Sequence, residues 1–506
     1  MENRAQWGTR AGFILAAVGS AIGLGNIWRF PYVAYENGGG AFFIPYLFAL
    51  LTAGIPILIM EFTIGHKYRG SAPLSFFRLN GKKTEFLGWW GIFVSFVIST
   101  YYAVIIAWAM KYTIYSFNLS WGDKPQDFFF GDVLKLADTP GEVGGLVGGV
   151  AIPLVLVWVI CYIILLGGVK KGIELANRIF IPVLFVLFLC VVIRAITLDG
   201  AMVGLDAFFK PDVEKLLNPR VWVAAYGHIF FSLSIAFAIM ITYSSYLPKK
   251  SDITNNAFIT GFANSSVELL SGIGVFAVLG FMATTQGVDV KDVASAGVGL
   301  AFVVFPEIIN QMPGLNGLFG TFFFLSLVLA GITSLISICE TYIAGMSDKF
   351  NMSRRRSVTI GVGLSSVISL LYATKGGLYF LDVADYFINQ FGIAVIGLVE
   401  VILLAWVFRK LGVFEQHANA VSDIRLGWWW KVSLTFITPF VLGTMLFFLI
   451  KDNIAENYEG YPTSFLWTIG WPAAIGAFVM AIVFTSLKWK NNTHIATDYE
   501  DDKGGH

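Results

Sequence analysis

The chain has 506 residues, of which 56% are hydrophobic and only 13% are charged, with a formal net charge of +1. Soluble domains average about 25% charged residues, so this composition indicates a protein that crosses a membrane many times. It leaves no room for a separate catalytic domain, and a net charge near zero argues against a nucleic-acid partner. The three cysteines fall in apolar segments, which argues against a disulfide framework or a zinc site.

Apolar segments long enough to cross a bilayer recur along the whole chain. They are centred on residues 11–34, 42–65, 88–112, 149–168, 175–196, 221–247, 262–283, 317–346, 357–373, 383–408, 430–450 and 464–487. The sequence therefore predicts an all-α membrane protein with about twelve transmembrane helices.

Basic residues gather in alternate loops, after the second, fourth, eighth and tenth predicted spans. Because lysine and arginine mark cytoplasmic loops, both termini are predicted to be cytoplasmic, in a protein of the plasma membrane. Two loops on the opposite side have a character of their own. Residues 119–147 are acidic and rich in glycine, and residues 287–316 include a short apolar run, 298–306, that fits a re-entrant lid.

The first span contains the sequence Gly19-Ser-Ala-Ile-Gly-Leu-Gly-Asn-Ile-Trp-Arg-Phe-Pro31. Each glycine costs a helix about 1 kcal/mol relative to alanine, and a cation near the bilayer centre costs at least about 2.5 kcal/mol. Irregular backbone at this depth is tolerated only where it packs in protein or lines a cavity. We therefore predict a broken helix whose free carbonyls and amides face a cation and an anionic group. The alternative, a packing face based on Gly19-x-x-x-Gly23, does not account for Asn26 and Arg29.

The sixth span mirrors the first, because it places His228, Ser232 and Ser234 in apolar surroundings. Two interrupted spans, each the first in a block of five, predict an inverted repeat of five plus five helices, with the last two spans outside it. The predicted divisions are residues 1–10 (N-terminal latch), 11–197 (first repeat), 198–411 (second repeat), 412–490 (helices 11 and 12) and 491–506 (cytoplasmic tail).

Polar residues also lie inside other predicted spans. Asn264 and Glu268 are four residues apart, on one face of the seventh span. Thr333 and Ser334 in the eighth span offer hydroxyl oxygens, the hard ligands that small cations prefer. The structural alternative for these two residues is a hydroxyl bonded back to the preceding turn. His228 by itself is more typical of a hydrogen-bonded core histidine.

Several motifs match a known family. The sequences Trp7-x-Thr-Arg10, Gly23-Leu-Gly-Asn-Ile-Trp-Arg-Phe-Pro31, Asn37-Gly-Gly-Gly-Ala-Phe42, Tyr101-Tyr102, Phe230-Phe-Ser232 and Ala330-Gly-Ile-Thr-Ser334 resemble the neurotransmitter:sodium symporter family, in its prokaryotic-like amino-acid transporter branch. The likeness covers nearly the whole chain in order. It implies a LeuT-type fold with discontinuous helices 1 and 6, and sodium-coupled transport by alternating access.

The resemblance also implies where ligands bind, with two sodium ions expected. The first sodium site would comprise Ala21, Asn26, Ser232 and Asn264 with the substrate carboxylate, and the second Gly19, Ile22, Ala330, Thr333 and Ser334. The substrate would contact Ala21, Gly25, Ile98, Tyr102, Phe231, Ser232, Ser234, Phe237, Ser334 and Ile338. The outer gate would comprise Arg29, Asp385, Tyr102 and Phe231, and the inner gate Arg4, Trp7 and Asp348.

Departures from the family pattern refine the expected substrate. Gly23 stands where monoamine carriers have an aspartate, which favours a zwitterion that brings its own carboxylate. Glu268 stands where chloride-dependent members have a serine, so its charge is expected to replace chloride and to take up a proton on the return step. His228 replaces the usual glutamine and is expected to pair with Glu268 and tune its proton affinity. Ala236 and Ala238, where many members have glycine, are expected to narrow the pocket and favour an aliphatic substrate.

The predicted function is therefore import of a small neutral amino acid, coupled to sodium and independent of chloride. A non-α amino acid such as taurine or GABA is the alternative substrate. A channel would need a continuous polar pore, and an enzyme would have only His228 and Glu268 as a candidate catalytic pair; a non-transporting sensor is the remaining alternative. The expected partners are the zwitterionic substrate and membrane lipid, and the number of subunits is left open.

Overall fold

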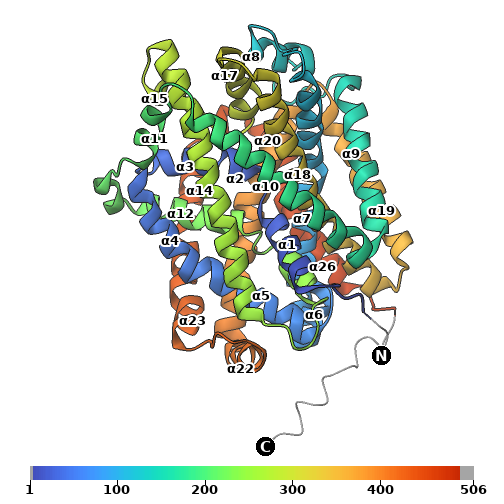
Figure 1. Cartoon of the computed structure of the whole chain (residues 1–506). Helices are drawn as coiled ribbons and strands as arrows, with labels where there is room; N and C mark the ends of the chain where they lie inside the picture. Colours follow the sequence, from blue (N-terminus) through green and yellow to red (C-terminus); the bar gives the residue numbers. More distant parts are fainter. Residues whose placement is uncertain (1–3, 491–506) are drawn as a thin grey trace, which may run out of the picture.

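The computed structural model describes residues 4–490, which form a bundle of helices (Figure 1). Ten of the described helices are long and apolar enough to cross a membrane, and the bent first pair supplies an eleventh span. The described residues contain two isolated β-bridges, Gly39 with Pro211 and Leu146 with Thr374, and no strands. The predicted all-α membrane fold is confirmed. The predicted tail, 491–506, lies outside the described residues.

The first half of the chain forms five spans, joined by short helices. The first span comprises α1 (Arg10–Ala21), α2 (Leu24–Trp28) and α3 (Phe30–Glu36), and the second η1 (Gly40–Phe42), α4 (Phe43–Ala49), η2 (Leu50–Gly54) and α5 (Ile55–Tyr68). The third is α7 (Lys82–Tyr115), the fourth α9 (Gly148–Leu166), and the fifth η4 (Val169–Glu174) with α10 (Leu175–Ile196). The connections contain α6 (Ala72–Asn80), α8 (Pro125–Asp127) and η3 (Phe128–Val133).

The second half continues in the predicted order. The sixth span comprises α12 (Pro219–Ser232) and α13 (Ile239–Ser244), the seventh α14 (Ile253–Gln286), the eighth α18 (Asn316–Phe350), and the ninth α19 (Arg354–Ser369) with η7 (Leu370–Ala373). The tenth comprises α20 (Gly377–Phe387), η8 (Ile388–Ile393), α21 (Ala394–Ile402) and η9 (Leu403–Val407). The eleventh comprises α23 (Trp428–Val432), η10 (Ser433–Ile437), α24 (Thr438–Ala455) and η11 (Tyr458–Gly460), and the twelfth α25 (Thr463–Phe465), η12 (Leu466–Gly470) and α26 (Trp471–Ser486). The connections contain α11 (Ala201–Phe209), η5 (Val213–Leu217), α15 (Val290–Val293), α16 (Gly297–Gly299), η6 (Leu300–Val304), α17 (Phe305–Gln311) and α22 (Leu411–Val421).

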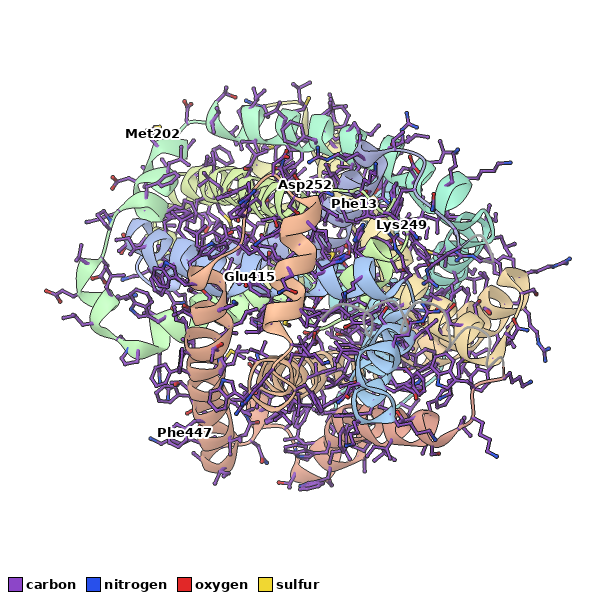
Figure 2. The ribbon with its side chains drawn as sticks, turned by 90° about the horizontal axis from the view of Figure 1, so that it is seen from below. Phe13, Met202, Lys249, Asp252, Glu415 and Phe447 are labelled. Carbon is purple, nitrogen blue, oxygen red and sulfur yellow. The ribbon has the colours of Figure 1, made fainter. Side chains whose placement is uncertain are left out.

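The inner and outer helices of the bundle differ in burial. The most apolar stretch of α18 is 89% buried and that of α7 and α14 is 78% buried, whereas α24 and α26 are only 28% buried. Seen from below, Phe447 of α24 projects from the periphery, whereas the fully buried Phe13 of α1 lies inside (Figure 2). The first, third, seventh and eighth spans therefore form the interior, and the last two spans present apolar side chains outside.

The first span breaks where the glycines predict. α1 ends at Ala21, Ile22 and Gly23 are not helical, and the chain resumes as α2 and α3 with its axis bent by 57°. The carbonyls at the end of α1 and the amides at the start of α2 therefore have no partners within their own helices. This break lies in the middle of the bundle.

The sixth span breaks across residues 233–238. Ser234, Ala236 and Ala238 have φ angles of 53°, 67° and 61°, a left-handed conformation that costs a residue with a side chain about 1–2 kcal/mol. Glycine adopts this conformation at no such cost, so it is well suited to the positions of Ala236 and Ala238, where the family resemblance leads us to expect glycine in many relatives. The expectation that Ala236 and Ala238 narrow the pocket is wrong. Neither residue lines the central cavity, which lies between the two broken spans. The backbone N–H of Ala236 donates instead to Glu61 Oε1, at 2.7 Å.

The predicted lid segment forms an apolar helical stretch, Gly297–Gln311, at the upper end of the bundle in Figure 1. Phe302 anchors it, stacking on Phe129 of η3 with ring centroids 5.2 Å apart and on Phe324 of α18 at 5.9 Å. Residues 296–298 line the central cavity. The segment thus borders the cavity on the side of the upper loops; its movement as a lid stays a prediction.

Candidate substrate and ion site

A cavity of about 590 Å³ lies between the two broken spans. Every residue predicted to contact the substrate lines it: Ala21, Gly25, Ile98, Tyr102, Phe231, Ser232, Ser234, Phe237, Ser334 and Ile338. These residues come from the first, third, sixth and eighth spans, which are separated widely in sequence. The fold therefore brings the predicted substrate residues together around one space.

The cavity extends further toward the upper end than the sequence predicted. There it is lined by Tyr386 and Asp382 of α20, and by Tyr458 and Tyr461 near the end of the eleventh span. The hydroxyls of Tyr458 and Tyr461 donate to the two carboxylate oxygens of Asp382, at 3.0 and 2.9 Å. The Tyr386 ring stacks on Tyr458 with centroids 3.7 Å apart. Sequence reasoning missed this aromatic rim, because no local pattern joins α20 to the loop after α24.

The residues predicted for the second sodium site converge on the end of α1. The Ser334 hydroxyl lies 3.2 Å from the Ile22 carbonyl oxygen and 3.4 Å from that of Gly19. The buried Thr333 hydroxyl donates to the Ala330 carbonyl oxygen at 3.0 Å. This is the back-bond that the structural alternative predicts, and it leaves the hydroxyl lone pairs available. The result is a group of carbonyl and hydroxyl oxygens of the kind that hard cations bind.

The residues predicted for the first sodium site form a buried group that we call the amide cluster: Asn26, Ser232 and Asn264. Asn26 Nδ2 donates to Asn264 Oδ1 at 2.8 Å, and Asn264 Nδ2 donates to Ser232 Oγ at 2.5 Å. Asn26 Oδ1 accepts the backbone N–H of Gly23 at 2.9 Å, which ties the cluster to the break in the first span. Ala21, the fourth predicted residue, lines the same cavity.

Glu268 accepts hydrogen bonds beside the amide cluster and is completely buried. Its Oε1 accepts from Asn26 Nδ2 at 3.1 Å and from the Ser232 hydroxyl, and its Oε2 accepts from the Tyr46 hydroxyl. His228 Nε2 lies 2.8 Å from Oε1, the contact that sequence reasoning expected. Its effect on proton affinity stays a prediction. The contact of Tyr46 with Glu268 was not predicted, because a tyrosine in the long apolar second span is typical of a packing residue.

The predicted outer-gate residues line the upper part of the cavity without closing it. Arg29 and Asp385, both in the described part of the chain, do not form an ion pair within 4 Å. The Arg29 guanidinium lies over the Phe231 ring, 5.0 Å from its centroid, and Asp385 Oδ1 accepts from Asn389 Nδ2 at 2.8 Å. The cavity therefore continues past both residues to Glu459, an exposed residue of η11.

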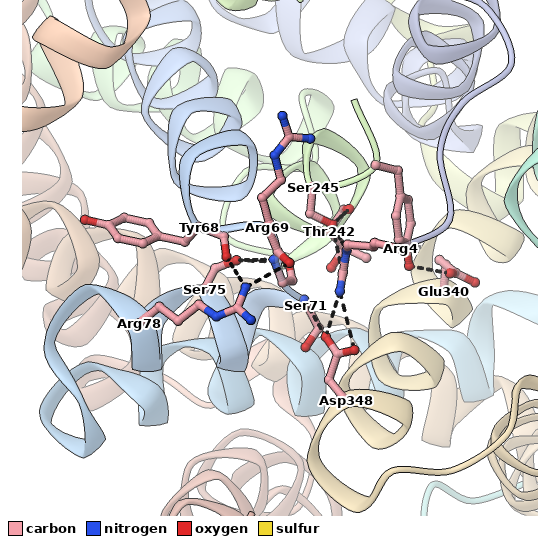
Figure 3. A network of polar contacts seen from close by, with 12 residues as sticks. Arg4, Tyr68, Arg69, Ser71, Ser75, Arg78, Thr242, Ser245, Glu340 and Asp348 are labelled. Atoms are coloured by element: carbon pink, nitrogen blue, oxygen red, sulfur yellow. Dashed lines mark hydrogen bonds and ion pairs between the residues drawn. The ribbon is translucent and has the colours of Figure 1, made fainter. Parts of the chain in front are cut away.

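Two of the predicted inner-gate residues, Arg4 and Asp348, are in contact with each other (Figure 3). Arg4 pairs with Asp348 at 3.2 Å and donates to the Ser245 hydroxyl at 2.9 Å. The indole N–H of the buried Trp7 donates to the Tyr243 carbonyl oxygen at 2.8 Å. These contacts join the segment before α1 to the sixth and eighth spans.

A second layer of contacts extends the inner gate. The Arg4 guanidinium lies 5.0 Å from the centre of the Tyr246 ring, and the Tyr246 hydroxyl donates to Glu340 Oε1 at 2.8 Å. Glu340 in turn pairs with Arg354 at 2.7 Å. Glu340 is not among the residues that the sequence predicted for the inner gate. The structure is therefore closed at the lower end and open at the upper end.

Two broken helices around a central cavity are typical of secondary transporters. The model of the sodium:neurotransmitter symporter family matches residues 4–125 and 118–492, so the chain belongs to this family. An uncharacterized sodium-dependent transporter of Methanocaldococcus jannaschii is 41% identical over 485 residues, covering 96% of this chain and 98% of the relative. The human sodium- and chloride-dependent taurine transporter is 30% identical over 94% of this chain and 83% of its own length. The human sodium- and chloride-dependent GABA transporter 2 is also 30% identical, over 94% of this chain and 85% of its own length. The predicted family is confirmed, and with it a sodium-dependent transporter.

Proposed function

We propose that this protein is a sodium-coupled symporter that brings a small neutral amino acid into the cell by alternating access, without a requirement for chloride. The proposal that transport does not require chloride rests on one observation, the buried Glu268 carboxylate beside the amide cluster. Among the described residues no lysine or arginine pairs with it, and its ion-pair contact is His228 Nε2 at 2.8 Å. A buried carboxylate without a permanently charged partner is costly, and a sodium ion beside it reduces that cost.

The surroundings of Glu268 favour this role. The Tyr46 and Ser232 hydroxyls and the Asn26 amide all donate toward its oxygens. A set of O–H and N–H donors beside a cation site is what a bound chloride ion would use in a relative without the carboxylate. Here the carboxylate accepts these hydrogen bonds itself and supplies one negative charge. Chloride-dependent relatives such as the human taurine transporter would obtain that charge from the ion.

Sodium and substrate are proposed to bind together. The Tyr102 hydroxyl accepts the backbone N–H of Leu24 at 3.2 Å, so its own hydrogen is free to donate to a substrate carboxylate. If that carboxylate also ligates the first sodium ion, each ligand raises the affinity for the other, and the effect is reciprocal. The membrane potential then contributes about 2.3 kcal/mol per sodium charge per 100 mV.

The lower part of the cavity suits a small aliphatic zwitterion. Ile98, Phe237 and Ile338 provide apolar contacts. A Cβ atom at Gly23 would lie 3.1 Å from the Tyr102 hydroxyl, and glycine supplies no carboxylate for a lone substrate amine. An α-amino acid therefore fits better than a monoamine. The second candidate is a non-α amino acid, favoured by the similarity to the taurine and GABA transporters.

The experiment is uptake into proteoliposomes of labelled α-amino acids, taurine and GABA, with sodium replaced by potassium or chloride by gluconate. We expect sodium-dependent uptake of an aliphatic α-amino acid that is equal in chloride and in gluconate. We expect Glu268→Ser to lower uptake about tenfold in gluconate and to recover it in chloride. Glu400→Gln is the matched control, because it removes another buried carboxylate and should leave uptake insensitive to chloride. A chloride requirement in the unmodified protein would refute the role of Glu268, and no sodium-driven uptake of any substrate would refute the symporter.

A further inference from the structure

Two polar side chains of the fifth span fill space left by glycines of α1. Gly12 and Gly19 are two helical turns apart and so share one face of α1, which packs against α10. A Cβ atom at Gly12 would lie 2.2 Å from Glu174 Oε1, and one at Gly19 would lie 2.3 Å from Asn177 Oδ1. Any larger residue at either position would therefore displace one of these side chains.

Asn177 has an oxygen without a partner. The side chain is 0% exposed, and its Nδ2 donates to the Ile173 carbonyl oxygen at 2.9 Å. Its Oδ1 has no hydrogen-bond partner. A buried acceptor left unsatisfied costs about 1–3 kcal/mol, so this oxygen calls for an explanation. Packing alone would be satisfied by a leucine of similar size.

Glu174 is buried at the start of α1. It is only 2% exposed, and its carboxylate accepts the backbone N–H of Gly8 at 2.6 Å and the Thr9 hydroxyl at 2.9 Å. The nearby Lys170 does not pair with it within 4 Å, and no other described lysine or arginine does so. The carboxyl group therefore holds the N-terminal end of α1 and has no lysine or arginine counter-ion among the described residues.

These groups lie in line with the second sodium site. The Gly19 carbonyl oxygen is one of the oxygens proposed for that site, and Asn177 Oδ1 packs against the same residue. Glu174 Oε1 lies beside Gly12, two turns of α1 and so about 10 Å nearer the lower end. Oxygens of Gly19, Asn177 and Glu174, which are hard ligands, thus follow one face of α1 from the site toward its N-terminal end.

We propose that Asn177 and Glu174 form a transit site for the sodium ion that leaves the second site toward the lower end. This inference rests on the proposed symport. While α1 is held, the Glu174 carboxylate is engaged by Gly8 and Thr9. When α1 moves away from the fifth span, those two hydrogen bonds break and the freed carboxylate attracts the departing cation, which Asn177 ligates on the way.

The test compares net uptake with exchange in proteoliposomes. Exchange with sodium and substrate on both sides does not require sodium to leave an empty carrier, whereas net uptake does. We expect Asn177→Leu to retain sodium-dependent substrate binding and exchange, and to slow net uptake about tenfold. Asn177→Asp, which keeps an oxygen, should retain net uptake. Ile181→Leu is the packing control, because Ile181 also contacts Gly19 from α10 and carries no polar atom.

The outcomes separate the inference from the proposed function. Unchanged net uptake in Asn177→Leu, or equal losses of uptake and exchange, would overturn the transit site while the unmodified protein still transports. No sodium-dependent binding or uptake by the unmodified protein would instead overturn the symport itself. If the leucine variant does not fold, Glu174→Gln decides the question by the same two assays, because it keeps one acceptor oxygen and removes the charge. Slow net uptake with intact exchange supports the site, and any other result overturns it.

Discussion

A buried ion pair at the lower end of the bundle offers a direct test of how the last span is held in place. Lys349 of α18 and Glu85 of α7 lie 2.5 Å apart, and both side chains are 0% exposed. The indole N–H groups of Trp89 and Trp489 donate to the two oxygens of Glu85, at 3.0 and 3.3 Å. The Lys349 ammonium also lies 4.8 Å from the Trp489 ring centre. Because Trp489 follows α26, this pair fastens the chain beyond the last helix to the third and eighth spans.

We expect Lys349→Met to be far more destabilising than its loss of one contact suggests. Removing one partner of a buried pair leaves the other charge uncompensated, at a cost of about 3–5 kcal/mol. Adding Glu85→Gln removes that charge and keeps an acceptor for one of the two indole N–H groups. The double variant should therefore recover most of the lost stability, although it has lost more charge than the single variant.

Thermal unfolding in detergent, followed by the loss of the monodisperse peak in size-exclusion chromatography, measures this difference. With an unfolding entropy of about 2.1 cal/mol/K per residue, a chain of 506 residues loses roughly 1 °C per kcal/mol. The single variant should unfold about 3–5 °C lower than the unmodified protein, and the double variant within about 1 °C of it. A double variant at least as unstable as the single one would refute the reasoning, because it would show that the two charges are not coupled.

Three further substitutions test other parts of the structure. Gly25→Ala places a Cβ atom 2.9 Å from the Phe231 ring; we expect about a tenfold weaker substrate affinity in equilibrium binding, and an unchanged affinity would contradict the packing of Phe231 on this glycine. Ala238→Gly relieves a left-handed φ of 61°, so thermal unfolding should show no loss, in contrast to the loss of about 1 kcal/mol for the same change inside a regular helix. Arg4→Ala removes the ion pair with Asp348 and should speed hydrogen–deuterium exchange at the start of α1; unchanged exchange would show that this pair does not hold the gate.

The sequence contained enough local information to predict the order of the spans and the break in the first one. Gly23, Asn26 and Arg29 cannot be explained in a helix that only crosses lipid, so the break is visible in the residues themselves. The contact of Tyr458 with Asp382 joins positions 76 residues apart, and no local periodicity signals it. Such contacts depend on how whole helices pack, which the one-dimensional pattern does not encode.

The outer gate shows a second limit of sequence reasoning. The resemblance predicts Arg29 and Asp385 as partners, and the structure places both on the cavity without an ion pair between them. A transporter alternates between conformations that differ by only a few kcal/mol. A sequence that supports both conformations identifies the gate residues but does not determine which gate is closed in a given structure.

The buried acids divide into two groups according to what neutralises them. Glu85 and Glu340 have a lysine and an arginine as partners, and both brace the lower end of the bundle. Glu61, Glu174, Glu268 and Glu400 have no lysine or arginine partner among the described residues. The first three each accept a hydrogen bond from a distant part of the chain. Their contacts are the break in the sixth span, the start of α1 and the amide cluster. Because an acid paired with a fixed cation gains little from sodium, we propose that Glu61, Glu174 and Glu268 are the acids through which sodium binding changes the balance between conformations.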